Sequence, residues 1–212
     1  HHAEPIFAGL GCATQYIGFT SEDRYDPAVP RERSFFHLAG GSINKGTELL
    51  LETWRRHPEW PLLRVLQSPK NAKEGAPVAN IDHRIGYIDD AELRQLQNAS
   101  RFHICSSETE GYGHYLVEAM GVGAVVLATD APPMHEMITP DRGIRIAWAR
   151  TGEQNLATTY FVSEQGIVDA VERALALDEA EVSAMGAAAR QWFVDNDQAF
   201  AGRVAAGLAR FL

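Results

Sequence analysis

Short apolar runs alternate with segments of helical periodicity from residue 34 onward. Apolar runs bounded by glycine, proline or polar residues are typical of buried strands. Such runs predict strands at residues 34–40, 61–68, 83–88, 101–107, 124–130 and 143–148. Apolar positions at helical spacing predict helices at residues 47–57, 89–100, 113–123, 164–177, 179–196 and 199–212. This alternation indicates an α/β fold with a doubly wound, Rossmann-like parallel sheet.

The ends of these segments carry recognisable stop and start signals. Pro58 and Pro61 end the first predicted helix, and Asp89 is a favourable N-cap for the second. The polar stretch 69–80 predicts a surface loop. Ligands of doubly wound sheets bind outside the carboxyl ends of the strands, so we expect a site in the loops that follow the strands.

Residues 1–33 do not show this alternation of predicted strands and helices. The stretch 15–34 predicts one short strand and then a charged linker punctuated by prolines. The chain begins without methionine, so we expect a fragment or a processed chain; whether His1 and His2 are native stays open. We therefore divide the chain into the trailing edge of a missing N-terminal domain (1–33), a ligand-binding Rossmann-like domain (34–197) and a C-terminal helix (198–212).

Composition and charge exclude several kinds of partner. The 212 residues include 19 Lys and Arg against 28 Asp and Glu, a formal charge of −9, whereas a nucleic-acid partner requires a basic face. No apolar stretch approaches the roughly 20 residues that span a bilayer, and we expect no signal peptide ahead of the fold. Cys12 and Cys105 lie far apart and are expected as free thiols. We expect a cytoplasmic protein without an integral membrane segment.

The stretch SSETEGYGHYLVEAMGVGAVVLATD, residues 106–130, carries the strongest chemical signal. Gly111 and Gly113 permit close approach of the backbone to a ligand, and a helix that begins near Gly113 directs free N–H groups at that space. Glu110 precedes this helix and Glu118 lies inside it, so the two carboxylates suit separate parts of one extended ligand, such as the hydroxyls of a sugar and a ribose. Two solvated glutamates are the simpler interpretation, but the glycines and flanking strands favour a ligand site.

A second candidate lies in HLAGGSINKGTELL, residues 37–50. A predicted strand ends at Gly40–Gly41, and Lys45–Gly46 opens the next helix. A lysine at such a turn can reach a diphosphate as a point charge, although lysines near helix starts are common. Its value lies in its position, because the first strand–helix connection falls on the same sheet edge as Glu110.

These motifs closely resemble the retaining glycosyltransferases of family four. Residues 106–138 resemble the family signature PSxxEGFGLxxLEAMAxGxPVVA, GGSINKG resembles its first phosphate loop, and residues 84–100 resemble a third segment of the family. The resemblance covers residues 16–200. It implies the GT-B architecture, in which two Rossmann-like halves face each other across a cleft. This chain would be the C-terminal half, which binds the nucleotide-sugar donor, and the acceptor-binding half would be missing.

The resemblance also implies roles for single residues. Glu110 would approach the hydroxyls of the transferred sugar, Glu118 would hold the ribose, and Lys45 would neutralise the diphosphate. Catalysis would rest on Lys45 and Glu110 through charge stabilisation and donor orientation, with no metal and no cofactor besides the donor substrate. The other donor-binding positions lie in the phosphate loop, the glycine-rich turn and the segment that borders the base: Gly41, Gly111, Tyr112, Gly113, His114, Tyr115, Ile85 and Tyr87.

Some positions depart from the family pattern. Gly40 stands where the family has an arginine, which removes one phosphate contact. Ser106 replaces the usual proline and His114 the usual leucine, changes that could alter the choice of sugar. His135–Glu136 is expected in a structural capping role. The remaining histidines and large aromatics are expected in core or surface packing: His37, His57, His83, His103, Trp54, Trp192 and Phe193.

The leading hypothesis is half of a glycosyltransferase that transfers a hexose-type sugar with retention of the anomeric configuration. The missing N-terminal half would bind a glycan or lipid-linked acceptor and could attach the protein peripherally to a membrane. Two alternatives stay open: a nucleotide-sugar epimerase of the same architecture, against which EGYGHYLVEAM argues, and a non-catalytic module that binds nucleotide sugars. The base, the sugar, the acceptor and the oligomeric state also stay open.

Overall fold

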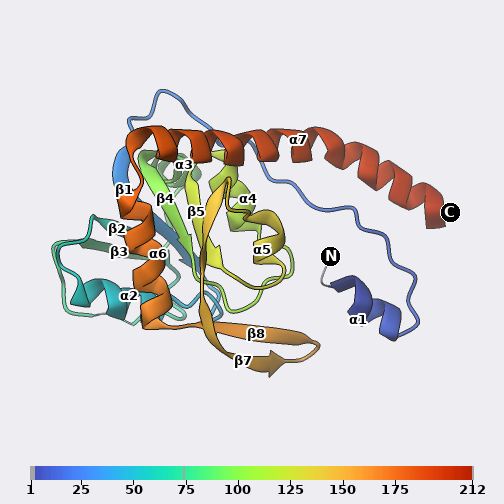
Figure 1. Cartoon of the computed structure of the whole chain (residues 1–212), viewed down its shortest axis with the longest axis horizontal. Coiled ribbons are helices and arrows are strands. Elements are labelled where there is room, and N and C mark those ends of the chain that lie inside the picture. Colours follow the sequence, from blue (N-terminus) through green and yellow to red (C-terminus); the bar gives the residue numbers. More distant parts are fainter. Residues whose placement is uncertain (1–2, 74, 212) are drawn as a thin grey trace.

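The computed structural model describes residues 3–73 and 75–211; the question about His1 and His2 lies outside them, as do Glu74 and Leu212. Its centre is a six-stranded sheet of parallel neighbours in the order β3-β2-β1-β4-β5-β6 (Figure 1). The strands are β1 (Glu32–Gly40), β2 (Leu63–Gln67), β3 (Ile81–Ile85), β4 (Ser100–Cys105), β5 (Val125–Thr129) and β6 (Gly143–Ile146). The strand order reverses between β1 and β4, so the predicted doubly wound sheet is confirmed.

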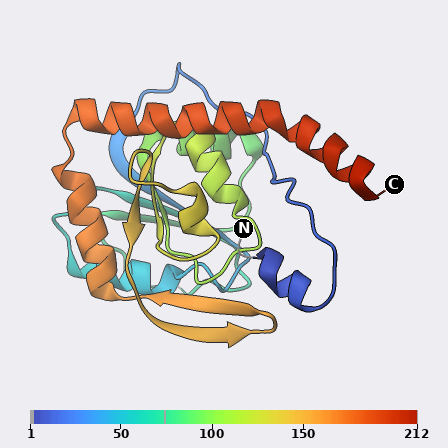
Figure 2. The same cartoon turned by 45° about the vertical axis from the view of Figure 1, so that its right-hand side comes forward.

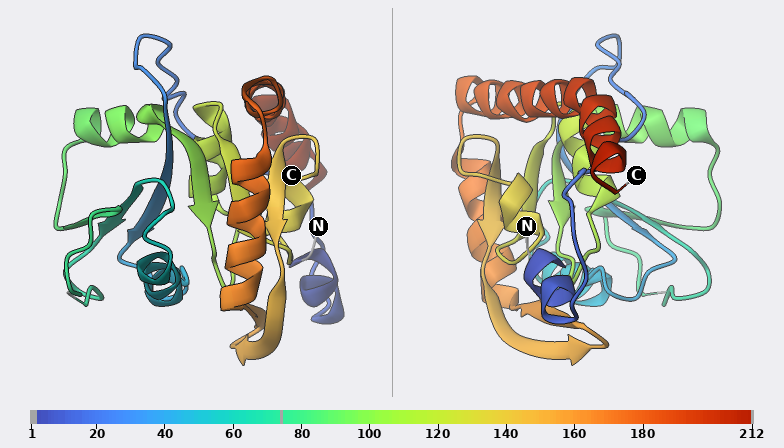
Figure 3. Two further views of the ribbon diagram at one scale, coloured as in Figure 1. Left: turned by 60° about the vertical axis from the view of Figure 1, so that its left-hand side comes forward. Right: turned by 90° about the vertical axis from the view of Figure 1, so that its right-hand side faces the viewer.

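Helices cover both faces of the sheet, with α6 and α3 on opposite sides in Figure 3. The helices are α1 (Ala3–Gly9), α2 (Thr47–Arg56), α3 (Asp90–Ala99), α4 (His114–Gly121), α5 (Met134–Met137), α6 (Glu164–Ala176) and α7 (Glu179–Phe211). One face of the sheet packs against α2 and α6, and the other packs against α3, α4, α5 and part of α7. The helices that follow β1 and β4 therefore leave the sheet on opposite sides.

The core follows the alternation of side chains along the strands. In β1, Phe35 packs against Trp54 of α2, whereas its neighbour Phe36 joins Leu96 of α3 in a separate cluster. Strands β4 and β5 divide their side chains between the two faces in the same way. Burial on both faces explains why these strands are continuous apolar runs in the sequence.

Helices α3, α6 and α7 begin at side-chain caps, and at α7 the Asp178 carboxylate accepts from the Glu181 N–H at 2.8 Å. The Asp89 carboxylate accepts a hydrogen bond from the Glu92 N–H at 2.8 Å at the start of α3. The Ser163 hydroxyl accepts one from the Gly166 N–H at 3.0 Å at the start of α6. Each cap satisfies an N–H group that the first turn of a helix leaves free, and the predicted Asp89 cap is confirmed.

An antiparallel hairpin, β7 (Trp148–Gln154) and β8 (Ala157–Val162), was not predicted. The strand expected at 143–148 ends at Ile146 as β6, and Trp148 already belongs to the hairpin. Its turn contains Asn155 with φ of 54°, a left-handed conformation that asparagine tolerates better than most residues. The hairpin lies across the carboxyl end of the sheet, opposite the end along which α7 runs (Figures 1 and 2).

The segment that precedes β1 contains no strand between residues 10 and 31, so the short strand expected in 15–34 is wrong. The Asn196 amide and the Arg203 guanidinium, both on α7, donate to the carbonyls of Phe19 and Ile17 at 2.7 and 2.8 Å. These side chains occupy carbonyl groups that strand pairing would otherwise use. The segment is therefore bound along α7, and the short helix α1 precedes it.

Helix α7 is one continuous helix of 33 residues, which corrects the two helices expected at 179–196 and 199–212. Asp197 and Gln198 looked like a break because they are polar, but neither blocks helical geometry, and no proline or glycine stands beside them. The division of the chain at residues 33 and 197 stays a prediction.

His37 is fully buried and held in one tautomer. Its Nδ1 donates to the Ile104 carbonyl at 2.8 Å, so its Nε2 accepts from the Thr47 hydroxyl at 2.9 Å. Burial lowers the pKa of His37 to about 4, and the charge of Lys45 acts in the same direction against the opposing effect of the Ile104 bond. The imidazole is therefore neutral in the folded protein at pH 7.

Acidification should destabilise the protein through this residue. An unfolded histidine takes up a proton near pH 6.5, whereas folded His37 does so only near pH 4. Between these values the unfolded state binds one more proton than the folded state. The free energy of unfolding should therefore decrease as the pH is lowered through this window. The expected loss from His37 is about 2 kcal/mol between pH 7 and pH 5.

Denaturant titrations of wild type and His37→Gln at pH 7 and pH 5 measure this effect. The variant should show a smaller decrease than wild type, because glutamine keeps hydrogen-bonding groups but does not titrate. His57→Gln is the matched control, since the partly exposed His57 ring is stacked on Trp60. Equal pH dependence in wild type and His37→Gln would contradict the prediction.

Candidate functional site

Two loops meet at the carboxyl ends of β1 and β4, where the strand order reverses. The β1–α2 loop holds Lys45, and the β4–α4 loop holds Glu110. The Glu108 N–H donates to the Asn44 carbonyl at 2.8 Å, and the Ser106 hydroxyl donates to the Lys45 carbonyl at 3.0 Å. The structure thus brings the two candidate motifs of the sequence together.

Gly46 makes this close approach possible. Its φ is 66°, and a Cβ atom at this position would lie 2.5 Å from the Ser106 carbonyl oxygen. A residue with a side chain would therefore meet both backbone strain and a clash. Gly113 also has a positive φ, of 92°, and α4 begins directly after it at His114, where the sequence predicted a helix start.

Lys45 and Glu110, the two predicted catalytic residues, form an ion pair. Lys45 Nζ lies 2.5 Å from Glu110 Oε1, although 65 positions separate the residues in the chain. Their side chains are only 15% and 13% exposed, so solvent ions screen this pair less than a surface pair. The same ammonium lies 3.8 Å from the centroid of the Tyr115 ring, within the range of a cation–π contact.

Ser107 belongs to the same cluster. Its buried hydroxyl donates to Glu110 Oε1 at 2.7 Å and lies 2.8 Å from the Tyr115 hydroxyl. Burial raises the pKa of Tyr115 well above its usual value, so this phenol is neutral. Sequence reasoning identified the backbone at Tyr115 but not its ring, and it gave Ser107 no role, because no spacing rule connects residues 45, 107 and 115.

Glu118 lies in different surroundings. Its Oε2 accepts a hydrogen bond from Nε2 of Gln97, a buried residue of α3, at 2.9 Å. Among the described residues, no hydrogen bond or ion pair joins Glu118 to Lys45 or Glu110. The two predicted glutamates therefore belong to separate hydrogen-bonding groups, and Gln97 is a neighbour that sequence reasoning missed.

Tyr112 and His114 contact the N-terminal segment rather than the ion pair. The Tyr112 hydroxyl donates to the Phe19 carbonyl at 2.7 Å, and the His114 ring stands edge-on to the Phe19 ring with centroids 4.0 Å apart. Gly111, between Glu110 and Tyr112, has open space where a Cβ atom would be. The glycine-rich turn thus faces two neighbours, the ion pair on one side and residues of the N-terminal segment on the other.

The other predicted donor-binding residues follow the ends of β1 and β3. The Gly41 carbonyl accepts from Asn71 Nδ2 at 2.6 Å. Ile85 is the last residue of β3, which ends earlier than predicted, and Tyr87 follows it with 91% of its surface exposed. Gly40 ends β1 with φ of 54°, so no side-chain cation stands at the position where the family has an arginine.

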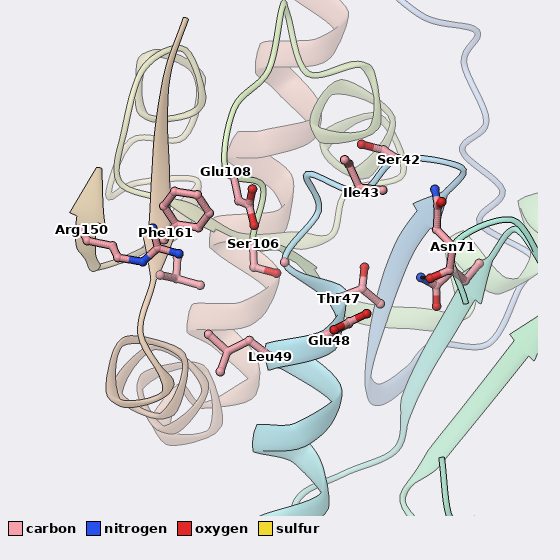
Figure 4. A pocket seen from close by; sticks show the side chains of 13 residues that line it. Ser42, Ile43, Thr47, Glu48, Leu49, Asn71, Ser106, Glu108, Arg150 and Phe161 are labelled. Carbon is pink, nitrogen blue, oxygen red and sulfur yellow. Dashed lines mark hydrogen bonds between the residues drawn. The ribbon is translucent and has the colours of Figure 1, made fainter. Parts of the chain in front are cut away.

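A cavity of about 420 Å³ lies next to the two loops (Figure 4). The β1–α2 loop, the first turn of α2, the β4–α4 loop and the hairpin line it. Arg150 and Phe161 form the hairpin wall, with the guanidinium 3.5 Å from the centroid of the ring. Burial raises the pKa of Glu108, which also lines the cavity, and Arg150 opposes this shift.

The hairpin is bound to both loops. The Tyr160 N–H donates to the Glu108 carbonyl at 2.7 Å, and Asn44 Nδ2 donates to Gln154 Oε1 at 2.8 Å. Sequence reasoning missed the hairpin, although Asn155 ahead of the β-branched and aromatic run 157–162 is a turn-and-strand signal.

The described part of the chain contains neither a metal-ligand cluster nor a membrane-spanning helix. Between residues 3 and 211, residue 74 excepted, no three His, Cys, Asp or Glu residues gather in a way that could hold a metal ion. None of the helices in these residues is both long and apolar enough to cross a membrane.

Comparison with known proteins places this geometry in a family. The family model described as Glycosyl transferases group 1 matches residues 32–192. A curated relative, the GDP-mannose:cellobiosyl-diphosphopolyprenol alpha-mannosyltransferase of Xanthomonas campestris, is 27% identical over 120 residues. That alignment covers 50% of this chain and 31% of the relative, so the aligned part spans less than a third of that protein's length.

Solved glycosyltransferases share the fold. The pneumococcal O-GlcNAc transferase GtfA in complex with UDP and GlcNAc superposes with a TM-score of 0.64 and 15% identity, over 93% of this chain and 39% of that chain. The C-terminal domain of a group 1 family glycosyl transferase (LpcC) from Francisella tularensis superposes with a TM-score of 0.55 and 21% sequence identity. The match covers 82% of this chain and 93% of that domain. With a family model matched over most of its length, this chain belongs to the glycosyl transferases group 1 family.

Proposed function

We propose that this chain is the donor-binding half of a retaining glycosyltransferase and binds a nucleoside-diphosphate sugar at the carboxyl edge of its sheet. The observation that carries the proposal is the Lys45–Glu110 ion pair at the reversal of strand order. A cation near the N-terminus of α4 suits a diphosphate, and a carboxylate beside it suits sugar hydroxyls. The Francisella tularensis structure, itself a C-terminal domain matched over 93% of its length, supports the assignment to one half of an enzyme.

Each residue then has a defined task. Lys45 and the free amides of α4 stabilise the negative charge that develops on the departing diphosphate. Glu110 orients the transferred sugar, and Glu118, held by Gln97, accepts hydrogen bonds from the ribose. The exposed ring of Tyr87 lies just beyond β3, on the side proposed for the base.

In this proposal the diphosphate of the donor competes with Glu110 for the Lys45 ammonium. In the ion pair, Glu110 neutralises Lys45. On binding, the diphosphate takes the ammonium, and Glu110 is released to accept hydrogen bonds from the sugar. An exchange of partners leaves no shielded charge unpaired in either state, which would otherwise be costly.

We further propose a hexose-type donor sugar and a glycan or lipid-linked acceptor. The Xanthomonas campestris relative is named for GDP-mannose and a diphosphopolyprenol acceptor, and GtfA was solved with UDP and GlcNAc. The acceptor would be held by a second domain that faces the carboxyl edge. Retention is tested by NMR of the product formed once such a domain is supplied, since an inverted anomeric configuration would refute it.

A panel of nucleotides tests donor binding directly. Thermal melts are recorded with GDP, UDP, ADP, dTDP and CDP, and then with the corresponding nucleotide sugars. A ligand that binds only the folded state raises the free energy of unfolding by about 2.7 kcal/mol at 100 times its dissociation constant. We expect at least one nucleoside diphosphate to raise the Tm. No shift with any of the five, together with flat calorimetric titrations, would overturn the proposed function.

Lys45→Met should weaken the binding of that nucleoside diphosphate by roughly 1.5–3 kcal/mol, because the variant loses a charge-assisted hydrogen bond. Calorimetric titration measures the change. Lys73→Met is the matched control, since Lys73 is 76% exposed and pairs with Glu48 on the surface. Equal affinities for Lys45→Met and wild type would remove Lys45 from the site.

Substitution of the two glutamates should affect ligand binding in different ways. Glu118→Gln should weaken a nucleoside diphosphate and its nucleotide sugar alike, because both contain the ribose. Glu110→Gln should weaken the binding of the nucleotide sugar only, because it loses the hydrogen bonds to the sugar. It should also tighten the free nucleoside diphosphate about twofold to fivefold, because Lys45 loses its competing carboxylate.

Paired titrations of each variant with the nucleoside diphosphate and the nucleotide sugar distinguish these outcomes. Both substitutions keep the side-chain volume, and circular dichroism checks that the variants fold. Wild-type behaviour of both variants in both titrations would mean that Glu110 and Glu118 do not bind the donor.

A further inference from the structure

Four side chains form a closed ring of contacts around the ion pair. Lys45 Nζ contacts Glu110 Oε1 at 2.5 Å, and the Ser107 hydroxyl donates to the same oxygen at 2.7 Å. Ser107 lies 2.8 Å from the Tyr115 hydroxyl, and the face of the Tyr115 ring lies 3.8 Å from Lys45 Nζ. Each member of the ring therefore touches two others.

The hydrogen bonds within this ring have only one possible donor-to-acceptor order. A serine hydroxyl has one proton, and Ser107 donates it to Glu110. Tyr115 must therefore donate to Ser107, which requires a neutral phenol, and burial raises the Tyr115 pKa accordingly. The hydrogen bonds run from Tyr115 through Ser107 to Glu110 and fix the position of that carboxylate.

The ring is anchored in the core. Ser107 is fully buried and Tyr115 is 9% exposed. The Ser107 carbonyl accepts a hydrogen bond from the Thr129 hydroxyl at 2.7 Å, which connects it to the end of β5. Burial and this bond therefore fix Tyr115 and Ser107, whereas Lys45 and Glu110 are partly exposed.

The two contacts of Lys45 differ in kind. Glu110 accepts a hydrogen bond from the ammonium and so competes with any other acceptor, such as a phosphate oxygen. The aromatic face attracts the charge without taking a directed hydrogen bond, so it does not block a new acceptor. Lys45 is also the only Lys or Arg in residues 40–46 and 106–115, and Gly40 offers no second cation. Within these two loops, the location of this one ammonium therefore sets the point at which a diphosphate would meet a positive charge.

We propose that Tyr115 and Ser107 are positioning residues of the donor site: the Tyr115 ring holds the Lys45 ammonium while it exchanges Glu110 for the diphosphate, and the Tyr115–Ser107 chain holds Glu110 ready for the sugar. This inference rests on the proposed function for the identity of the ligand. The ring of contacts itself is tested without any ligand.

Three variants separate the two roles. Tyr115→Phe keeps the ring and removes the hydroxyl, Tyr115→Leu removes both, and Ser107→Ala removes only the hydrogen-bond chain. Tyr25→Phe is the control, because Tyr25 also lies under a cation, Arg190 at 4.9 Å, but outside the two loops. Thermal melts show which variants fold; Tyr115→Phe and Ser107→Ala keep the test decisive if Tyr115→Leu does not.

The first measurement is NMR of the lysine side chains in the free protein. The ring current of Tyr115 should move the ε-methylene protons of Lys45 upfield in wild type, Tyr115→Phe and Ser107→Ala. The shift should vanish in Tyr115→Leu and persist in Tyr25→Phe. Unshifted Lys45 protons in wild type would overturn the inference.

The second measurement is calorimetric titration with GDP and GDP-mannose and with UDP and UDP-glucose. Tyr115→Leu should lower the affinity for the nucleoside diphosphate about tenfold. The affinity of Tyr115→Phe should stay within about twofold of wild type. Ser107→Ala and Tyr115→Phe should reduce the preference for the nucleotide sugar over the nucleoside diphosphate about threefold to tenfold.

Two results of these titrations would overturn the positioning roles. One is equal weakening of the nucleoside diphosphate by Tyr115→Phe and Tyr115→Leu, since the ring would then have no role of its own. The other is an unchanged sugar preference in Ser107→Ala. If wild type binds neither these four probes nor any other nucleoside diphosphate of the panel, the proposed function fails on its own account, and the NMR result still decides whether Tyr115 holds Lys45.

Discussion

The parallel pairing of β1 with β4 is the constraint on which the candidate site depends. In this register Phe35 lies opposite Phe102 and Phe36 opposite His103, so both strands deliver the chain to the same edge. Helix α2 then packs on one face of the sheet and α4 on the other. The two connecting loops must therefore run side by side before they diverge, and this divergence creates the space in which ligands of doubly wound sheets bind. Gly46 allows the loops to touch there, since any Cβ atom would meet the Ser106 carbonyl.

Lys45 places a positive charge at this point of an acidic protein. With a formal charge of −9, the chain as a whole repels anions, so an anion site requires a local cation held in place. Lys45 meets this requirement because its ammonium lies between the Glu110 carboxylate and the Tyr115 ring. The fold thus pairs a largely shielded positive charge with a carboxylate from the neighbouring loop, which lowers the cost of shielding it from solvent.

Elements outside the parallel sheet brace the two loops from different sides. The hairpin binds the Asn44 side chain and the Glu108 carbonyl, whereas Phe19 of the N-terminal segment contacts Tyr112 and His114. That segment is in turn held along α7. The geometry of the site therefore depends on residues 10–31 and 148–162 as well as on the sheet, which explains why a short motif alone does not define it.

The sequence by itself determined the doubly wound sheet, the Asp89 cap and the helix start after Gly113, because periodicity, capping and backbone freedom are local properties. It also identified Lys45 and Glu110 as residues of one sheet edge, since parallel strands end together. It did not foresee the hairpin or the continuous helix α7, because the local signals at Asn155 and Asp197 are weak. Only the tertiary structure decided that Lys45, Ser107, Glu110 and Tyr115 form one ring while Glu118 pairs with Gln97. The physical reason is that these contacts depend on the directions of side chains from elements far apart in the chain, and those directions are fixed only when the strands and helices pack.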